Sequence, residues 1–274
     1  MDIREAPAID VHCHYGAYVG RTPSLMDRLC KGDTTSILRQ LELANVRCAI
    51  VSSLKALLPR GAGAVLPGNE DVERICTDTG KLFQWAVLNP LEHETYKQAE
   101  ILLKHKKCLG IKIHPEEHVY PIKEYGKAIF SFAAKHNAIV QAHSGEENSE
   151  PMDYIIFTNE YPELRLILSH IGCGWDGDMT KQVRAIQASK HGNVYSDTSS
   201  AKSITPGLIE WAVKEAGSEK IMFGTDAPCY YAPMQRARID SAELENDDKQ
   251  NILYRTSLRL FGGELEKIYN NQHF

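Results

Sequence analysis

A short apolar run followed by a helical pattern recurs eight times along this chain. The apolar runs are rich in Val and Ile and do not alternate strictly with polar residues, which is typical of parallel strands that are buried on both faces. Eight such units within 274 residues predict an α/β fold, a single-domain (β/α)8 barrel that spans residues 1–274. A doubly wound open sheet is the alternative, because one sequence does not reveal the order of its strands. The expected strands are 8–12, 47–52, 83–89, 109–114, 138–143, 164–170, 193–197 and 220–225, and the expected helices are 34–44, 69–79, 94–106, 122–135, 151–161, 179–190, 206–216 and 242–260.

Two segments make the first half of the chain longer than the repeat requires. One is residues 15–33, after the first strand, and the other is residues 54–68, which contain Gly and Pro and follow the second strand. We expect 54–68 to form a loop over one end of the barrel, either as a tolerated surface insertion or as a functional lid. The sequence predicts that substrate selectivity lies in these two segments.

The composition argues against several classes of partner and location. The 36 acidic residues outnumber the 31 Lys and Arg residues, and the net charge of −5 leaves no basic field for nucleic acid. No apolar run of about 18 residues occurs, and the first residues do not resemble a signal peptide, so we expect no membrane attachment. The seven cysteines lack CxxC spacing, which is typical of reduced thiols in a cytoplasmic protein. We expect a small-molecule substrate as partner, and a homo-oligomer is compatible with this composition.

Histidine and aspartate residues fall at the ends of the predicted strands. His12 and His14 lie two residues apart on the first strand, so both side chains share one face. His143 precedes His170 by 27 residues and His170 precedes Asp226 by 56, which is close to two further repeats. Because the carboxyl ends of all strands meet at one rim of a barrel, where barrel active sites are built, we expect these side chains to face one another.

These side chains carry the donors that a divalent metal ion prefers. Imidazole nitrogen and carboxylate oxygen suit Zn²⁺ or a similar first-row ion, and the set contains none of the thiolates of a structural zinc site. A lone histidine at a strand end, such as His114, is more often a hydrogen-bonded structural residue. A metal site is predicted because four histidines and one aspartate occupy comparable strand-end positions in their repeats.

The chain resembles the amidohydrolase superfamily of metal-dependent TIM-barrel hydrolases. The closer resemblance is to the amidohydrolase-related branch, which includes nonoxidative decarboxylases and hydratases. It implies that His12, His14, His143 and Asp226 bind one divalent ion, which we expect to be Zn²⁺, with Mn²⁺ or another ion as the alternative. It also implies that His170 lies beside the ion, where it polarises the substrate or helps to move a proton. The matching segments are IDVHCH (9–14), GIKIHP (110–115), VQAH (140–143), LSH (168–170), FGTD (223–226) and the C-terminal stretch 251–262.

Lys112 raises the alternative of two metal ions. Its segment resembles the strand-four lysine segment of dihydroorotases, in which a carboxylated lysine bridges two metals. On that reading Lys112 and His170 bind a second ion. We favour one ion, because the closer branch is mostly mononuclear, with Lys112 then paired with a carboxylate or a substrate anion. We expect His114, Lys112 and Trp175 to contact substrate, and packing is the alternative role of Trp175.

The expected chemistry follows from the proposed ligands. A metal ion lowers the pKa of a bound water towards about 7 and polarises a carbonyl group. Asp226 would accept the proton of that water and pass it to the leaving group, and His170 would stabilise developing negative charge. We predict a metal-dependent hydrolase of a small, carboxylated ester, lactone or amide. The alternative is a nonoxidative decarboxylase or hydratase of the same branch.

A second motif suggests a different class of enzyme. Residues Gly172 to Gly177 match G-x-G-x-x-G after a predicted strand, and Asp197 follows at about the spacing of a ribose-binding acid, as in a dinucleotide-dependent oxidoreductase. Asp176 and Asp178 argue against this alternative, because they would repel pyrophosphate at the helix N-terminus. A non-catalytic metal-binding barrel is the third class, and the complete set of ligands argues against it.

Overall fold

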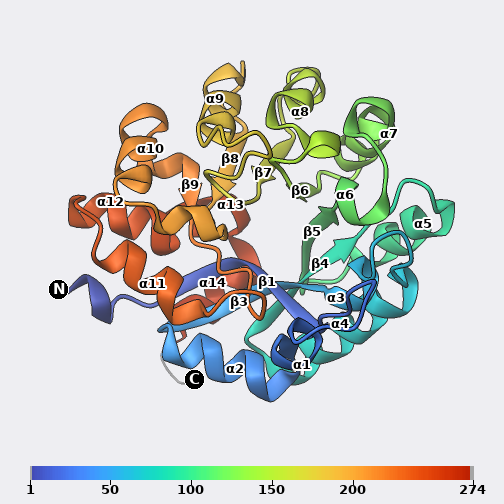
Figure 1. Cartoon of the computed structure of the whole chain (residues 1–274), viewed down its shortest axis with the longest axis horizontal. Coiled ribbons are helices and arrows are strands. Elements are labelled where there is room, and N and C mark those ends of the chain that lie inside the picture. Colours follow the sequence, from blue (N-terminus) through green and yellow to red (C-terminus); the bar gives the residue numbers. More distant parts are fainter. Residues whose placement is uncertain (1, 272–274) are drawn as a thin grey trace.

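The strands of this protein form one curled sheet, with helices packed around it (Figure 1). The computed structural model describes residues 2–271, and within them the sheet has nine strands in the order β2-β1-β3-β4-β5-β6-β7-β8-β9. Strand β1 and the strands from β3 to β9 pair in parallel, and the two-residue β2 runs antiparallel to β1. The strands are β1 (Ala8–Ala17), β2 (Lys31–Gly32), β3 (Val46–Ser53), β4 (Leu82–Val87), β5 (Cys108–Ile113), β6 (Ile139–Ala142), β7 (Arg165–Leu168), β8 (Val194–Asp197) and β9 (Ile221–Met222).

The sheet closes on itself through β1 and the segment that follows β9. The N–H of Val11 donates to the carbonyl of Phe223 over 3.0 Å, and the N–H of His14 donates to the carbonyl of Ala227 over 2.7 Å. A parallel bridge between Cys13 and Ala227 belongs to the same junction. The predicted (β/α)8 barrel is therefore confirmed, and the alternative of an open sheet is wrong, because the first and last parallel strands are joined by hydrogen bonds.

Helices connect successive parallel strands, as the alternating pattern predicted. The longer ones lie outside the sheet in Figure 1 and cover it with their apolar faces. The helices are α1 (Met26–Leu29), α2 (Thr34–Leu43), α3 (Leu54–Leu57), α4 (Val65–Thr79), α5 (His93–Leu102), α6 (Pro115–His118), α7 (Ile122–Lys135), α8 (Pro151–Thr158), α9 (Lys181–Ala188), α10 (Leu208–Ala216), α11 (Ala232–Asp240), α12 (Asn246–Gln250), α13 (Thr256–Phe261) and α14 (Gly263–Asn270).

Two expectations about local structure were wrong. Residues 54–68 are not a simple loop, because they contain α3 and the first turn of α4. The expected last helix over 242–260 is divided into α12, a π-helical segment at Asn251–Arg255 and α13, and the sequence reading missed α11 and α14. Both differences arise where short helices follow one another without the long apolar period on which the predictions relied.

An irregularity in β1 determines which side chains enter the barrel. Ile9 and Val11 belong to a buried cluster with Trp85 of β4. The register with β3 shifts between Asp10 and Cys13, and the carbonyl of Val11 accepts hydrogen bonds from the Trp85 indole and the Gln141 amide. Such a bulge changes the side of the sheet to which the following side chains point. Consecutive residues of a regular strand face opposite sides of the sheet. Because of the bulge, Val11 and the two histidines that follow it, His12 and His14, can all face the barrel interior.

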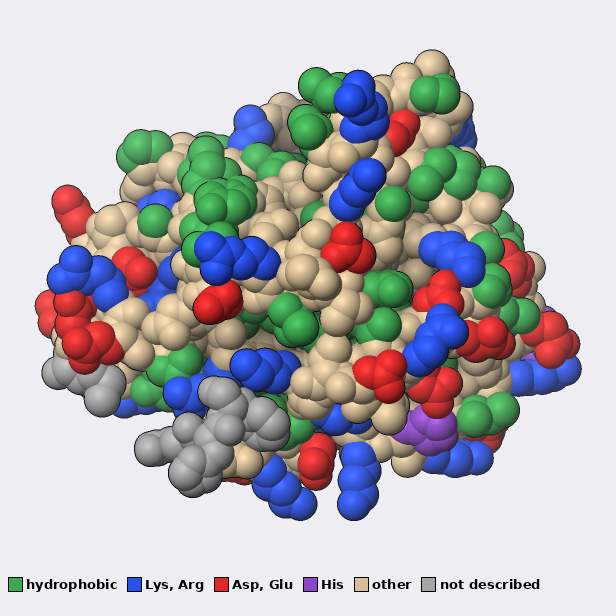
Figure 2. All heavy atoms as spheres, turned by 90° about the horizontal axis from the view of Figure 1, so that it is seen from below, with side chains coloured by type: hydrophobic (Ala, Val, Ile, Leu, Met, Phe, Trp, Pro, Cys, Tyr) green, Lys and Arg blue, Asp and Glu red, His purple; other side chains and the backbone are tan. Residues whose placement is uncertain are grey.

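The outer surface mixes charges of both signs. Figure 2 shows Lys and Arg side chains interspersed with Asp and Glu over one face of the molecule. Exposed ion pairs occur in the structure, such as Arg39 with Glu42 (3.0 Å) and Lys97 with Glu94 (2.7 Å), and such pairs contribute little to stability. Within residues 2–271 no helix is both long enough and apolar enough to cross a membrane.

Candidate active site

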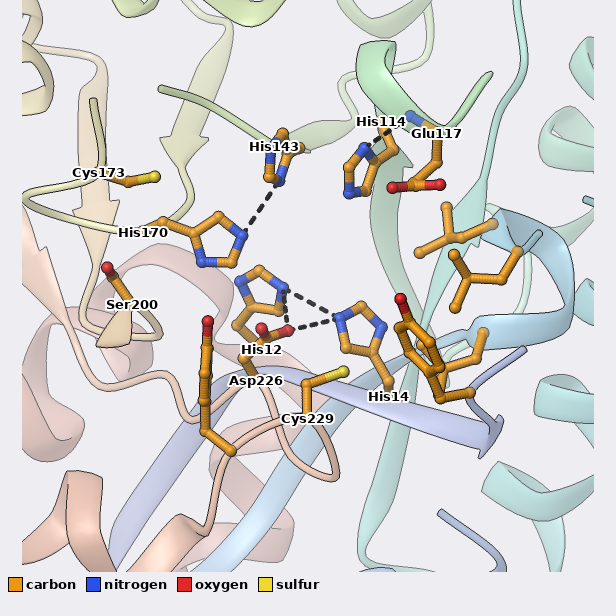
Figure 3. Close-up of a pocket in the computed structure, with 15 residues that line it drawn as sticks. His12, His14, His114, Glu117, His143, His170, Cys173, Ser200, Asp226 and Cys229 are labelled. Carbon is orange, nitrogen blue, oxygen red and sulfur yellow. Dashed lines mark hydrogen bonds and ion pairs between the residues drawn. The ribbon is translucent and has the colours of Figure 1, made fainter. Parts of the chain in front are cut away.

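Three predicted ligands converge inside the barrel mouth. Nε2 of His12 lies 3.3 Å from Nε2 of His14, and Oδ1 of Asp226 lies 2.8 Å from the His14 nitrogen and 3.4 Å from the His12 nitrogen (Figure 3). The two histidines come from β1, and Asp226 comes from the segment after β9 that closes the sheet. Barrel closure therefore brings together residues from opposite ends of the sequence.

The spacing of these three atoms fits a bound divalent ion. Donors that bind an ion at about 2.0–2.2 Å in tetrahedral or octahedral geometry lie about 2.8–3.6 Å from one another. The three observed separations fall in that range. The donor set of two imidazoles and one carboxylate is also one that Zn²⁺ and Mn²⁺ accept.

Each histidine has a hydrogen-bond partner on its other nitrogen. Nδ1 of His12 lies 3.0 Å from the carboxylate of Asp197 and 2.9 Å from the hydroxyl of Ser199, and Nδ1 of His14 lies 2.8 Å from the hydroxyl of Ser52. Partners of this kind fix the ring orientation and leave the inward-facing nitrogen free to bind metal. The residues present therefore fit a metal centre.

Burial controls the charges of these groups. Desolvation, followed by the nearby positive charge of Lys112, lowers the pKa of His12 well below its ordinary value, so the imidazole is neutral. Burial on its own would raise the pKa of Asp226, but the hydrogen bond to His14 and the neighbouring imidazoles outweigh it and hold that pKa below the ordinary value. A neutral imidazole and an ionised carboxylate are the forms that bind a metal ion.

His143 and His170 form a second pair beside the first group. Nδ1 of His143 lies 3.1 Å from Nε2 of His170, and the His170 ring centroid lies 4.9 Å from that of His12. Nε2 of His143 lies 2.6 Å from the carboxylate of Glu146, so its other nitrogen points into the mouth. Among the described residues, the compact groups of possible ligand atoms contain His12 with His14 and Asp226, and His12 with His170 and Asp197, but not His143.

Two site residues adopt a backbone conformation that is unusual for residues with side chains. His170 has a φ of 69° and Asp226 has a φ of 59°, both in the left-handed region. Each follows the end of its strand, β7 or β9. Strain of this kind persists where the surrounding structure enforces it, and it gathers at functional sites.

Lys112 lies next to His12 and, unlike His114, is not among the residues that line the cavity described below. Its Nζ is 3.2 Å from Nε2 of His12 and 3.2 Å from the hydroxyl of Ser169. The side chain is fully buried, and burial lowers the pKa of its amine to about 8. His114 is also close, because its ring stacks on that of His143 with centroids 3.9 Å apart.

A cavity of about 200 Å³ opens onto these residues. Its lining includes a polar group, the histidines and Asp226 (Figure 3), and an apolar leucine wall of Leu54, Leu57 and Leu58. The leucines belong to the segment 54–68, and Tyr18 joins them from the segment 15–33. The two segments predicted to hold selectivity therefore line the cavity.

The predicted substrate contact of Trp175 needs correction. Its side chain is 57% exposed and is not among the cavity-lining residues, and the amine of Lys181 lies 5.4 Å from the centre of its ring. The backbone N–H of Trp175 donates to the carbonyl of Gly145, which holds the loop with the indole turned outwards. Its position at the rim was predictable from the sequence, but its side-chain direction was not.

Sequence reasoning missed most of the supporting residues. Asp197 ends β8 and was considered only as a ribose-binding acid, but its carboxylate is fully buried among His12, Ser199 and the backbone of His170. Its strand-end position was the signal that could have assigned it to the site. Nothing in the sequence marked Ser199 or Glu146.

Comparisons with known proteins agree with this architecture. A family model described as Amidohydrolase matches residues 64–263, well over half of the chain, although β1 with its two histidines lies outside the matched range. No curated protein sequence matches the chain significantly.

Several solved structures share the fold at low sequence identity. A 2,6-dihydroxybenzoate decarboxylase from Rhizobium is 12% identical with a TM-score of 0.71, covering 92% of this chain and 98% of its own. A 5-carboxyvanillate decarboxylase from Sphingomonas paucimobilis is 12% identical with a TM-score of 0.72, covering 93% and 99%. The enzyme of that name from Novosphingobium aromaticivorans, complexed with manganese, is 10% identical with a TM-score of 0.71, covering 94% and 96%.

Proposed function

The chain belongs to the amidohydrolase family, and from that premise we propose that it is a divalent-metal-dependent nonoxidative decarboxylase of small carboxylic acids. Hydrolysis was the main expectation from the sequence, and decarboxylation was the alternative. The alternative now has better support, because the similar solved structures named above are decarboxylases.

We assign the metal centre to His12, His14 and Asp226, with Nδ1 of His143 as a fourth ligand. The contact between His143 and Glu146 supports this role, because metal-binding histidines usually donate their other N–H to a carboxylate or carbonyl group. The centre suits Zn²⁺ or Mn²⁺, and a relative with manganese in its structure supports Mn²⁺. One ion is the proposal, and two ions would require carboxylation of Lys112.

The proposal for the substrate rests on the residues that line the cavity. It combines the His12, His14 and Asp226 cluster with a leucine wall, and none of its described lining residues is Lys or Arg. A small acid with an apolar body would place its carboxylate at the ion and its body against the leucines. The relatives' names point to hydroxylated aromatic acids as the first compounds to test.

In the proposed reaction the bond between the substrate and its carboxylate breaks, CO₂ leaves and the carbon gains a proton. A bound divalent ion would polarise the substrate oxygen atoms and draw electron density away from the breaking bond. Asp226 is ionised, so it can accept a proton from a substrate hydroxyl group. His170 lies beside the ligands with Nδ1 2.9 Å from the Ser199 hydroxyl, and burial lowers its pKa well below the ordinary value, so its imidazole is neutral. We assign to it the transfer of the proton from Asp226 to the carbon as the carboxylate leaves, and the substrate oxygen then regains a proton from water.

The decisive experiment measures CO₂ release by protein loaded with Mn²⁺ or Zn²⁺. Carboxyl-labelled 2,6-dihydroxybenzoate and 2,4-dihydroxybenzoate, which carry one carboxylate each, are followed by ¹³C NMR in D₂O, with a panel of esters, lactones and amides in parallel. We expect labelled CO₂ and bicarbonate, and one deuterium on the carbon that lost the carboxyl group.

The matched control is the His12→Ala protein under the same metal loading, which should release no CO₂. Hydrolysis of a member of the ester, lactone and amide panel, without CO₂ release from any carboxylic acid, would overturn the proposal in favour of the hydrolase. Metal analysis of the same samples counts the ions per chain, and two would support carboxylated Lys112.

We further propose that the enzyme works in the cytoplasm. All seven cysteines are free thiols, which suits a reducing compartment.

A further inference from the structure

Glu117 brings a negative charge to the outer part of the cavity. It belongs to the short helix α6, and its side chain lines both the cavity and a neighbouring surface depression of about 240 Å³. Figure 3 shows its carboxylate beside the ring of His114. No sequence argument pointed to this residue.

Only one of the two carboxylate oxygens of Glu117 has a hydrogen-bond partner among the described residues. Oε1 accepts a hydrogen bond from the guanidinium of Arg60 over 3.0 Å, whereas the buried Oε2 has no hydrogen-bond partner among residues 2–271. The side chain as a whole is 15% exposed. A buried carboxylate oxygen without a partner is costly, so it favours any ligand that can donate to it.

Apart from Arg60, which donates to Oε1, no cation from the described cavity lining contacts Glu117. The cavity contains no Lys or Arg among its described lining residues, and the Arg60 side chain is 40% exposed. Tyr18 lines the same region, and its pKa is raised, first by burial and then by the charge of Glu117. Because Oε2 is buried, a ligand reaches it only after the carboxylate turns, and the last torsion of a glutamate side chain is broad enough to allow this.

We propose that Glu117 is a specificity residue that selects acids carrying a hydroxyl or amino group at the end away from the metal and rejects acids carrying a second carboxylate there. This inference rests on the proposed function for the position of the substrate carboxylate at the ion. A hydroxyl or amino group would donate to Glu117. A second carboxylate would lie against the Glu117 carboxylate, and the ion pair with Arg60 offsets only part of the repulsion between the two like charges.

The test measures dissociation constants by calorimetry for the Mn²⁺-loaded protein. The probes are the meta and para isomers of hydroxybenzoate, aminobenzoate, methylbenzoate and benzenedicarboxylate. In the unmodified protein we expect the hydroxyl and amino compounds to bind at least about tenfold more tightly than the methyl compounds, with the dicarboxylates weakest. In Glu117→Gln the disadvantage of the dicarboxylates should shrink about tenfold or more, because the repelling charge is gone.

Two further variants separate the carboxylate from its ion pair. Arg60→Gln should keep the preference for hydroxyl and amino compounds, because Glu117 remains, and Glu124→Gln, on the exposed side of α7, controls for the loss of one negative charge elsewhere. The proposal is overturned if Glu117→Gln retains the original order of affinities, if Arg60→Gln loses the preference as Glu117→Gln does, or if dicarboxylates bind the unmodified protein best.

Binding and turnover distinguish this inference from the proposed function. If the preference appears but none of the acids tested for turnover releases CO₂, decarboxylation fails while the selectivity of Glu117 stands. If CO₂ is released without any preference, the reverse holds.

Discussion

Asp197 holds His12 by a buried contact of 3.0 Å between its Oδ2 and Nδ1 of the imidazole. The other carboxylate oxygen accepts the backbone N–H of His170 over 3.1 Å, so one side chain orients two histidines of the site. Asp197→Asn should lower the affinity for Mn²⁺ by about 10- to 100-fold, because an amide holds the imidazole less firmly in the metal-binding tautomer. Titration of chelated protein with Mn²⁺ measures this. Asp176→Asn, at an exposed acid outside the cavity, should keep the original affinity, and equal affinities in both variants would contradict the assignment.

Asp226 is predicted to be essential for turnover. Asp226→Asn keeps the shape of the side chain but removes the charge and the ability to accept a proton. We expect turnover of the true substrate to fall by about a thousandfold or more, with the fold preserved. Steady-state rates together with circular dichroism test this. A folded, fully active Asn variant would rule out the role.

Substitution of His143 and substitution of His170 should affect metal content and turnover differently. If His143 is the fourth ligand, His143→Asn should release metal on dialysis and lose turnover with it. His170→Asn should keep its metal but turn over substrate about 100-fold or more slowly, because proton transfer is lost. Metal content measured on both dialysed variants decides between the roles. The opposite pattern would make His170 the ligand.

Lys112 should make the stability of the metal-free protein depend on pH. Its folded pKa of about 8 lies below the ordinary value of 10.5, so between these values the unfolded chain binds more protons and stability rises with pH. Below pH 8 the buried charge costs about 3 kcal/mol, so Lys112→Met should raise the free energy of unfolding by up to that amount. The gain should fade as the pH rises to about 10.5. Urea unfolding across this range measures it, and a gain that does not change with pH would show that packing, not charge, is responsible.

The sequence predicted those parts of the site that depend on repeat and strand geometry. His12, His14 and Asp226 came together because strand ends meet at one rim, and the same rule placed His143 and His170 beside them. It could not say which of those two lies nearer the three-residue group, since that depends on side-chain torsions and on the left-handed backbone at His170.

Residues whose role depends on tertiary contacts could not be predicted from the sequence. Glu117 lines the cavity while it is hydrogen-bonded to Arg60, which lies 57 residues away along the chain, and nothing in the local sequence marks that contact. Trp175 lies in the expected loop, but its side chain is exposed, in a loop held by tertiary contacts such as the hydrogen bond from its N–H to Gly145. The last helix was misread for a similar reason, since a π-helical segment interrupts its period.

The joining of β1 to the segment after β9 also governs when the site can form. During synthesis on a ribosome His12 and His14 emerge early, whereas Asp226 follows more than 200 residues later. A nascent chain therefore contains His12 and His14 long before the Asp226 carboxylate has been synthesised. Full metal affinity is then a property of the finished barrel, and ion uptake reports that the first and last strands have met.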